Sequence, residues 1–295
     1  MPPAERTGGR VVLYVLRVRS VRPHERVVAW DPHVPGVREV FHARFVEHAY
    51  PPHAHQAWTV LIVDAGAIRY ALDRRSRGSD AAHVTVLPPH VTHDGRAAGS
   101  GGFAKRVVYL DEDVVGAHLI GRAVDQPAVG DERLVRQVRA LHDALRHPVD
   151  ALEAETRVAF VAEHVTAQLA GARPGPARGD AVDDGGGGER GAHVAGALRD
   201  LLDADPVTSR TLRSLAAEID VSPTHLVRCF TARFGVAPHA YLVGQRVDAA
   251  RRMLLDGRAP AEVAVATGFH DQAHLTRHFR RHVGTTPGRY RRRAG

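Results

Sequence analysis

The C-terminal third of the chain carries apolar residues at helical spacing, and the same pattern occurs twice. The residue series His-Leu-x-Arg-x-Phe begins at His225 and begins again 49 positions later at His274. Each series follows a shorter apolar stretch, Thr211–Ile219 in the first copy and Pro260–Thr267 in the second. Self-similarity at a fixed offset indicates one supersecondary unit used twice. The pattern therefore predicts two helix-turn-helix units, joined by a single helix over Pro238–Leu255.

Capping residues fix where the longer helix of each unit begins. Ser222 followed by Pro223 is an N-cap and a first helical residue, and Asp271 is the equivalent cap in the second unit. Apolar residues at helical spacing predict the inward faces, which are Leu226, Phe230 and Phe234 in the first helix and Leu275, Phe279 and Val283 in the second. The outward positions are Thr224, His225, Val227, Arg228 and Thr231 in the first helix, and Gln272, Ala273, His274, Thr276, Arg277 and Arg280 in the second.

The N-terminal half has the pattern of short strands. The expected strands are Phe41–Val46, Trp58–Asp64, Ile68–Leu72, Val84–Leu87 and Phe103–Leu110. Glycine and proline turns and a polar loop over Arg74–Asp80 separate them. Many short strands at close spacing predict a small antiparallel β-barrel. Within the second strand the even positions, beginning with Trp58, face opposite to the odd ones; both sets are apolar, so either face could line the barrel.

Two amphipathic segments follow, and then a stretch without apolar residues to bury. Glu132–Arg146 and Ala151–Leu169 both carry apolar stripes at helical spacing. Such a stripe is either core or a face for a partner helix, and in the second case Leu141 and Leu145 are the candidates to face a second copy of the chain. Residues 171–191 are rich in glycine and proline and are expected to form a flexible linker. The expected organisation is therefore a leader with the first strands (1–38), a barrel with trailing helices (39–170), the linker (171–191) and an all-α double helix-turn-helix domain (192–295).

The charged residues are unevenly distributed along the chain, and this distribution indicates a binding partner. Residues 206–295 contain 15 arginines and 6 acidic residues, a net charge of +9, whereas the whole chain carries +7, so residues 1–205 sum to −2. A basic segment that coincides with two helix-turn-helix units favours binding to the phosphates of double-stranded DNA. Among the outward residues, arginine and glutamine can grip guanine and adenine edges, and threonine can touch a thymine methyl group.

Composition also excludes several classes of protein. One cysteine cannot form a disulfide framework or a cysteine-rich zinc module. The chain has no run of 18 apolar residues and no convincing signal peptide, so we expect a cytoplasmic protein without a membrane partner. Lys105 is the only lysine among 40 basic residues, which we attribute to codon bias.

The stretch Leu215–Arg293 resembles the DNA-binding domain of AraC/XylS-type transcription regulators. The residues that carry the resemblance are Ser222-Pro223-Thr224-His225-Leu226, Arg246–Leu255, Gly268-Phe269, Asp271-Gln272, His274-Leu275, Arg277, Phe279, Gly284-Thr285-Thr286-Pro287 and Tyr290-Arg291. The resemblance implies that the DNA contacts come from Thr224, Val227, Arg228, Gln272, Ala273, His274, Thr276 and Arg277. His225 and His274 could instead buttress their helices. The family mostly activates transcription, which implies RNA polymerase as a further partner.

The N-terminal half is similar to the cupin-like sensor domain that many of these regulators carry. The similar features are Pro51-Pro52-His53-Ala54-His55, Gly66, Leu87-Pro88-Pro89 and His93-Asp94-Gly95. The resemblance implies that the barrel binds a small effector and that the two helices after it form a homodimer contact. The expected effector-binding residues, which combine apolar surface with polar groups, are His53, His55, Trp58, Tyr70 and His93.

The same histidines leave a second interpretation open. Cupin enzymes hold a metal with two histidines, a glutamate four to five residues later and a distal histidine, and here His53, His55 and His93 could take the histidine places. Thr59 and Val60 stand where the glutamate would be. We therefore expect a regulator without enzymatic activity or cofactor. The alternative is a metal-dependent cupin enzyme tethered to DNA.

Overall fold

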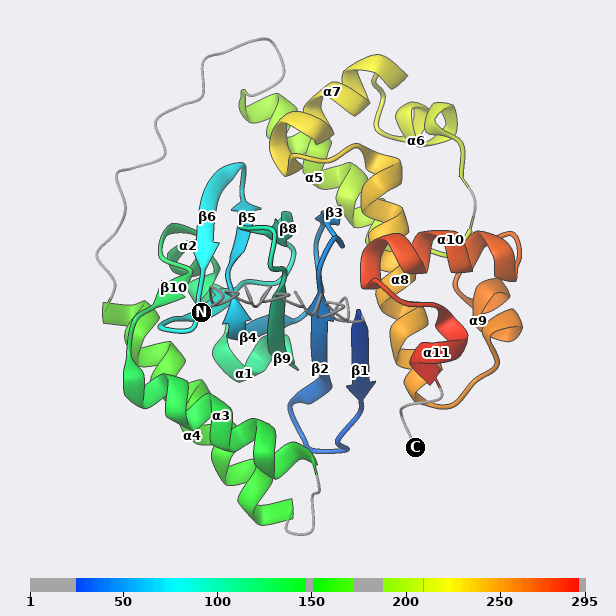
Figure 1. Cartoon of the computed structure of the whole chain (residues 1–295). Helices are drawn as coiled ribbons and strands as arrows, with labels where there is room; N and C mark the ends of the chain where they lie inside the picture. Colours follow the sequence, from blue (N-terminus) through cyan, green and yellow to red (C-terminus); the bar gives the residue numbers. More distant parts are fainter. Residues whose placement is uncertain (1–24, 147–150, 172–187, 209, 292–295) are drawn as a thin grey trace, which may run out of the picture.

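A computed structural model of the protein describes residues 25–146, 151–171, 188–208 and 210–291 (Figure 1). Residues 1–24 of the expected leader and 172–187 of the expected linker lie outside the described residues. The strands are β1 (Arg26–Trp30), β2 (Val37–Phe45), β3 (Tyr50–His53), β4 (Trp58–Gly66), β5 (Ile68–Leu72), β6 (Arg75–Ser79), β7 (Val84–Leu87), β8 (His93–Ala97), β9 (Phe103–Leu110) and β10 (Ala128–Val129). Helices α1 (Glu112–Val115), η1 (Ala117–Leu119), α2 (Ile120–Asp125), α3 (Glu132–Arg146) and α4 (Ala151–Gly171) complete the N-terminal half.

The strands form two antiparallel sheets. One has six strands in the order β1-β2-β9-β4-β7-β10, and the other has four in the order β3-β8-β5-β6. Their inner faces share one buried cluster, to which Phe41 and Leu61 contribute from the first sheet and Tyr70 and Leu72 from the second. The predicted antiparallel barrel with trailing helices is confirmed as a fold class, although the strands close as two facing sheets and not as one hydrogen-bonded ring.

Helices α3 and α4 cover the outer face of the six-stranded sheet (Figure 1). Their apolar stripes pack against the even positions of β4, which explains why both faces of that strand are apolar. Leu141 and Leu145 are fully buried there, and the Trp30 indole donates a hydrogen bond to the Leu145 carbonyl oxygen at 2.8 Å. The expectation that these two leucines face a second chain is therefore wrong, because their own sheet occupies that face of the helix.

The C-terminal half is helical, as the sequence predicts. Its elements are α5 (Glu189–Ala204), α6 (Leu212–Glu218), α7 (Pro223–Phe234), α8 (Pro238–Leu255), α9 (Pro260–Ala266), α10 (Gln272–Val283) and α11 (Pro287–Arg291). The predicted caps form: the Ser222 hydroxyl accepts from the His225 amide and the Asp271 carboxylate from the His274 amide. Gly235 ends α7 and Gly284 ends α10, both in the left-handed conformation. Helices α7 and α10 are the recognition helices of the two units.

Two expectations about irregular segments were wrong. The predicted polar loop over Arg74–Asp80 contains β6, which pairs with β5 through a two-residue turn at Asp73 and Arg74. Both turn residues have positive φ, +47° and +66°, as a tight hairpin turn of the right twist requires. The predicted linker extends too far, because α5 begins at Glu189.

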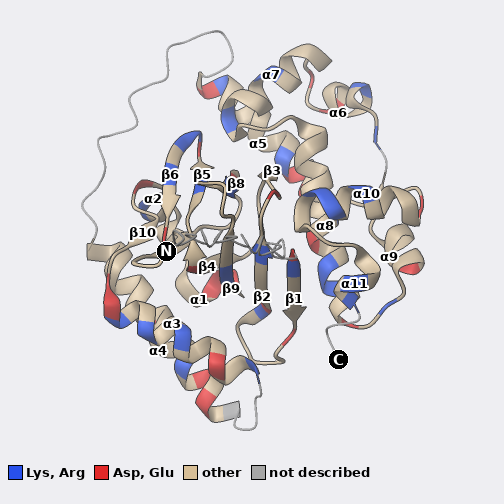
Figure 2. Cartoon of the chain, in the orientation of Figure 1, with Lys and Arg blue, Asp and Glu red and all other residues tan. Residues whose placement is uncertain are grey.

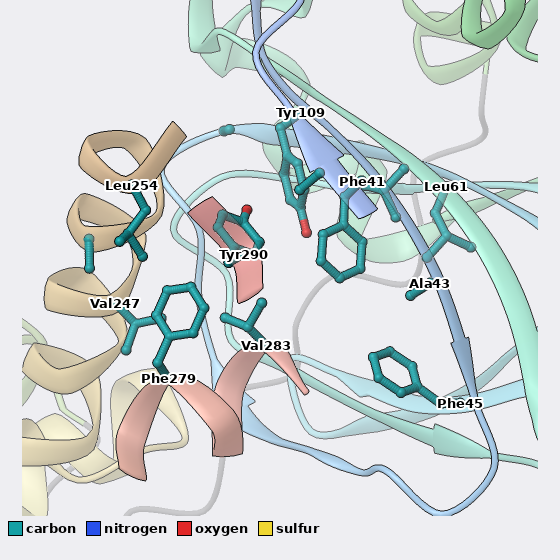
Figure 3. Close-up of a cluster of buried hydrophobic side chains, with 14 of the residues drawn as sticks. Phe41, Ala43, Phe45, Leu61, Tyr109, Val247, Leu254, Phe279, Val283 and Tyr290 are labelled. Carbon is teal, nitrogen blue, oxygen red and sulfur yellow. The ribbon is translucent and has the colours of Figure 1, made fainter. Parts of the chain in front are cut away.

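The two halves of the molecule share a hydrophobic core. Val247 and Leu254 of α8, with Phe279 and Val283 of α10, belong to the same buried cluster as the inner face of the barrel (Figure 3). The helix-turn-helix region therefore closes one side of the barrel. In the described residues no helix combines the length and the apolarity that crossing a bilayer needs.

Candidate nucleic-acid interface and interdomain cavity

Helix α7 turns its polar side to solvent. Leu226 and Phe230 are buried among α5, α6 and α8, so Thr224, Arg228 and Thr231 are exposed on the opposite side. Val227 and His225 are half-buried. The His225 ring lies 3.2 Å from an Arg228 nitrogen and 3.4 Å from the Cys229 sulfur, so it supports its own helix as well as bordering the exposed face.

Helix α10 has the same arrangement. Gln272, Ala273, Arg277 and Arg280 are exposed and, with Thr276, line an open depression on the surface. The Thr276 hydroxyl donates to the Gln272 carbonyl oxygen at 2.8 Å. Since that hydroxyl is committed to the helix, Thr276 offers a ligand its methyl group more readily than a hydrogen bond.

His274 contributes to the structure of the second unit. Its Nδ1 accepts a hydrogen bond from the His270 amide at 3.3 Å, and its ring stands edge-on to Phe269, with centroids 5.4 Å apart. These contacts fix the turn that precedes α10. Exposed arginines on α8, α10 and α11 give this part of the molecule a positive surface (Figure 2). They are Arg252, Arg277, Arg280, Arg281, Arg289 and Arg291.

A cavity of about 50 Å³ lies between the barrel and the helix-turn-helix region. The N-terminal half lines it with four of the five predicted effector-binding residues, His53, His55, Tyr70 and His93, and with Phe41, Tyr50, Thr59, Leu61, Lys105 and Tyr109 among others. The C-terminal half closes it with Arg251, His282 and Val283. Sequence patterns could not reveal this closure, because these residues come from a different domain.

Trp58 does not line the cavity, contrary to expectation. It lies on the outer face of its sheet, fully buried under the helices, and its indole donates a hydrogen bond to the Glu112 carbonyl oxygen at 3.2 Å. The odd positions of β4, among them Thr59 and Leu61, face the cavity instead. Alternation alone could not decide between two apolar faces.

Three cavity side chains, those of Tyr50, Thr59 and Lys105, have polar groups that the sequence did not connect with effector binding. The Tyr50 and Thr59 hydroxyls are buried and have no hydrogen-bond partner among the described residues. The Lys105 ammonium lies 4.2 Å from the centre of the Tyr50 ring, and burial, with the nearby charge of Arg251, lowers the pKa of Lys105 to about 7. Buried polar groups are normally satisfied, so these groups point to a polar occupant. The sole lysine of the chain therefore has a structural context that codon bias does not explain.

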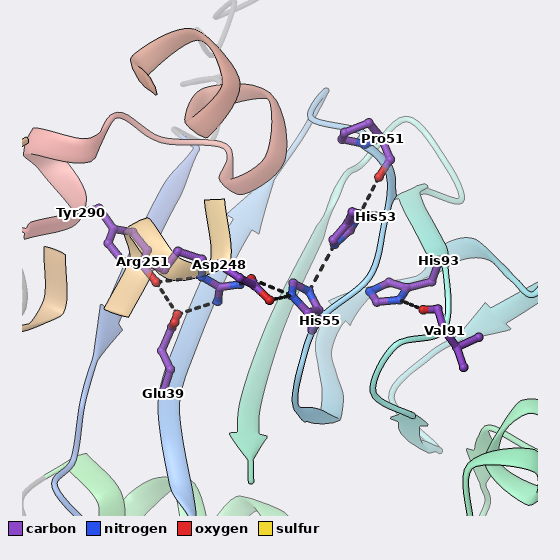
Figure 4. Close-up of polar contacts among 9 residues, drawn as sticks. All are labelled: Glu39, Pro51, His53, His55, Val91, His93, Asp248, Arg251 and Tyr290. Atoms are coloured by element: carbon purple, nitrogen blue, oxygen red, sulfur yellow. Dashed lines mark hydrogen bonds and ion pairs between the residues drawn. The ribbon is translucent and has the colours of Figure 1, made fainter. Parts of the chain in front are cut away.

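His53, His55 and His93 meet in the cavity wall (Figure 4). All three are buried, and each offers a ligand atom within 4.8 Å of the others. The Nε2 atoms of His53 and His55 are 3.2 Å apart. Burial and the neighbouring imidazoles lower the pKa of His53 well below its ordinary value and that of His93 to about 3, so both rings are neutral at physiological pH. These residues could hold a metal ion.

Polar contacts lock the two halves together beside this cluster (Figure 4). Arg251 of α8 forms an ion pair with Glu39 of β2 at 2.7 Å, and both side chains are 6% exposed. The Tyr290 hydroxyl donates to the same Glu39 carboxylate and accepts a hydrogen bond from Arg251 Nε. The His55 ring nitrogen Nδ1 lies 2.9 Å from the carboxylate of Asp248, which is also on α8.

The first helix-turn-helix unit is tied to the barrel as well. The Thr92 hydroxyl donates to the Phe234 carbonyl oxygen, at the end of α7, at 2.6 Å. The barrel thus contacts both units at positions away from the exposed faces of the recognition helices.

Comparisons with known proteins agree with this architecture. Residues 35–159 match an AraC-like ligand binding domain, and residues 215–293 match a helix-turn-helix domain. The transcriptional activator NphR of Rhodococcus is 37% identical over 95 residues, which is 32% of this chain and 27% of that protein. The HTH-type transcriptional regulator Rv1931c of Mycobacterium tuberculosis is 32% identical over 127 residues, which is 40% of this chain and 44% of that protein. The matches therefore span less than half the length of these relatives.

The crystal structure of ToxT from Vibrio cholerae O395 has a similar fold. It superposes with a TM-score of 0.53 over 92% of this chain and 97% of ToxT, at 10% identity. The ToxT likeness shows the fold, and the two matched domains confirm the resemblance that the sequence motifs indicated: the chain belongs to the AraC-like family, with an AraC-like ligand-binding domain followed by a helix-turn-helix domain.

Proposed function

We propose that this protein is a sequence-specific DNA-binding transcription regulator whose activity a small molecule controls. The observation that carries the proposal is the pair of recognition helices, each with a buried apolar face and an exposed polar one, both held by the barrel from behind. Adjacent major grooves on one face of DNA are about 34 Å apart, so one chain could engage two successive turns.

The proposed DNA-contacting residues differ in the bases that they are suited to contact. Arg228 and Arg277 are suited to guanine, because arginine can donate two hydrogen bonds to O6 and N7 in the major groove. Gln272 is suited to adenine, because its amide can accept a hydrogen bond from N6 and donate one to N7. Val227 and Ala273 can offer only apolar contacts to thymine methyl groups. The remaining proposed contacts are Thr224, His225, Thr231, His274, Thr276 and Arg280.

The proposed effector site is the interdomain cavity. A volume of about 50 Å³ holds only a few water molecules, so a larger effector must displace the residues that close the cavity. Arg251 and Val283 belong to α8 and α10, and their displacement would reorient the helix-turn-helix units. Solved structures describe ToxT bound to an unsaturated fatty acid and to a naphthyl-butenoic acid. Lys105 beside unpartnered hydroxyls supports an acidic or hydrogen-bond-accepting effector here as well.

We propose a homodimer in the cytoplasm that activates transcription together with RNA polymerase. NphR and VirF are named activators, and α4 exposes Leu152 and Phe160 by 72% and 54%, which supports α4 as the dimer contact. The family and the absence of a carboxylate at Thr59 and Val60 favour regulation over enzymatic activity.

Selection from a random DNA library with the full-length protein tests the proposal. We expect enrichment of a defined sequence, binding that weakens steeply as salt rises, and loss of enrichment when Arg228 and Arg277 are both replaced by alanine. Arg136→Ala, an exposed change on α3, serves as the matched control and should leave the selected sequence unchanged. Recovery of random sequences by the wild-type protein would overturn the proposal.

A further inference from the structure

We propose that His53, His55 and His93 bind a divalent transition-metal cation of the zinc, cobalt and nickel class, and that Asp248 of the helix-turn-helix region orients one of these ligands. The inference does not depend on the proposed DNA binding, because it follows from the side chains of the cavity wall.

The hydrogen bonds of the three imidazoles leave the same nitrogen free in each ring. Nδ1 of His53 donates to the Pro51 carbonyl oxygen at 2.7 Å, and Nδ1 of His93 donates to the Val91 carbonyl oxygen at 3.0 Å. Nδ1 of His55 faces the Asp248 carboxylate at 2.9 Å. Because a carbonyl or carboxylate oxygen can only accept, each Nδ1 carries a proton, so in the neutral form of each ring Nε2 presents a lone pair. Ligands of bound metals are oriented by the same kind of outer contact.

The spacing of the His53 and His55 nitrogens fits a tetrahedral ion, and all three ligand atoms lie within 4.8 Å of one another, so a small approach of the rings would complete the site. Two nitrogen ligands about 2.05 Å from a tetrahedral zinc lie roughly 3.3 Å apart, and the Nε2 atoms of His53 and His55 are 3.2 Å apart. The ring centroids are 4.5, 4.8 and 5.2 Å apart, where the same geometry gives roughly 5 Å. A proton between two rings would satisfy only two of the converging lone pairs, whereas a cation satisfies all three.

The donor set selects the class of cation. Three neutral imidazoles suit zinc, cobalt, nickel or copper, whereas magnesium and calcium require oxygen ligands. In the part of the chain that the structure describes, no other three histidine, cysteine or acidic side chains come close enough to share an ion. Three protein ligands leave a fourth position, and the cavity lies beside the cluster. An effector with an acidic group could therefore reach the ion.

Asp248 makes the site span both domains. It lies on α8, and its carboxylate is also 3.4 Å from Arg251, which pairs with Glu39 of the barrel. Asp248 is therefore a positioning residue: it would fix the His55 ring and its tautomer without touching the ion. Since docking of α8 supplies the carboxylate, metal binding and docking of the two domains should strengthen each other.

Titration of the metal-free, full-length protein with Co²⁺ tests the inference. We expect one Co²⁺ per chain, the visible absorption of a four- or five-coordinate nitrogen site, and displacement by Zn²⁺. In the proton NMR spectrum of the cobalt form, three exchangeable, paramagnetically shifted N–H signals should appear, one for each Nδ1–H. This readout needs no variant. No stoichiometric Co²⁺, or fewer than three shifted N–H signals, would overturn the three-histidine site.

Variants then assign the ligands. His93→Gln should abolish the absorption, whereas His193→Gln, at an exposed histidine of α5, should retain it; circular dichroism establishes that both are folded. Asp248→Asn should weaken Co²⁺ binding by about 10- to 100-fold and move one shifted N–H signal, and Asp248→Glu should recover part of the affinity. Absorption that persists in His93→Gln would refute the triad. Unchanged affinity in Asp248→Asn would refute the positioning role.

Discussion

Gly284 and Gly235 hold equivalent places in the two helix-turn-helix units, which allows the contact between the domains to be tested alone. Both end a recognition helix with positive φ, +81° and +74°. A Cβ at Gly284 would lie 2.4 Å from Cε1 and 2.6 Å from Cζ of Phe45 in the barrel, whereas a Cβ at Gly235 would meet Arg74 at 3.6 Å. Alanine at either position therefore has the same conformational cost, but only the Cβ of Gly284→Ala would overlap with a side chain of the other domain.

The magnitudes follow from these distances. Alanine in the left-handed region costs about 1–2 kcal/mol in either variant. Carbon atoms pack best at about 3.5–4.0 Å, so Gly284→Ala requires Phe45 or α10 to move by about 1 Å. The Phe45 ring is fully buried and packs against Phe103 and Tyr50, so it cannot yield freely. Overpacking of this kind costs about 1–3 kcal/mol, which is the extra loss expected for Gly284→Ala.

Urea unfolding of the full-length variants measures the difference, and hydrogen exchange locates it. Gly284→Ala should lose about 1–3 kcal/mol more than Gly235→Ala and should exchange faster in α10 and β2. Equal losses in the two variants, with unchanged exchange in β2, would show that the two domains do not pack at Phe45 in solution.

Three further predictions concern DNA recognition, the buried lysine and the dimer. Arg277→Ala should cost about 1–3 kcal/mol at one base pair of the selected DNA site, as measured with single-base variants; an even loss on every sequence would make it a phosphate contact. The pKa of Lys105 is about 7 in the folded protein and 10.5 ordinarily, so the unfolded chain binds more protons between these values and stability should rise with pH across that window. This rise in stability amounts to at most about 5 kcal/mol, and Lys105→Met should remove it. If the wild-type protein and Lys105→Met have the same pH dependence of urea unfolding, the prediction is wrong. Leu152→Asp combined with Phe160→Asp should give monomers in sedimentation, whereas Leu141→Asp should destabilise the fold; a monomeric wild-type protein at micromolar concentration would refute the dimer.

The helical half could be predicted closely because its signals are local. Ser222 and Asp271 cap their helices through backbone groups three residues away, and the apolar spacing of each recognition helix matches one buried face. Both partners of such a contact lie within a few residues of each other, so a local sequence pattern predicts it. Seven of the eleven outward positions predicted for α7 and α10 are exposed, whereas His225, Val227, His274 and Thr276 are half-buried.

The barrel was harder to predict because its decisive contacts are distant in sequence. Trp58 faces the covering helices and Thr59 the cavity, and only the packing of α3 and α4 decides between them. The hairpin before β6 was missed because Arg74 adopts a positive φ, which glycine or asparagine usually signals. Glu39 and Arg251 are 212 positions apart, and no periodic pattern in the sequence predicts their ion pair.

Footprinting of the selected DNA site at saturating protein concentration tests the central claim most directly. If both helix-turn-helix units bind DNA, the full-length protein should protect two major-groove windows on one face, about 10 base pairs apart. Arg228→Ala should weaken protection in one window and Arg277→Ala in the other. A single protected window, or two windows that neither variant changes, would contradict the account.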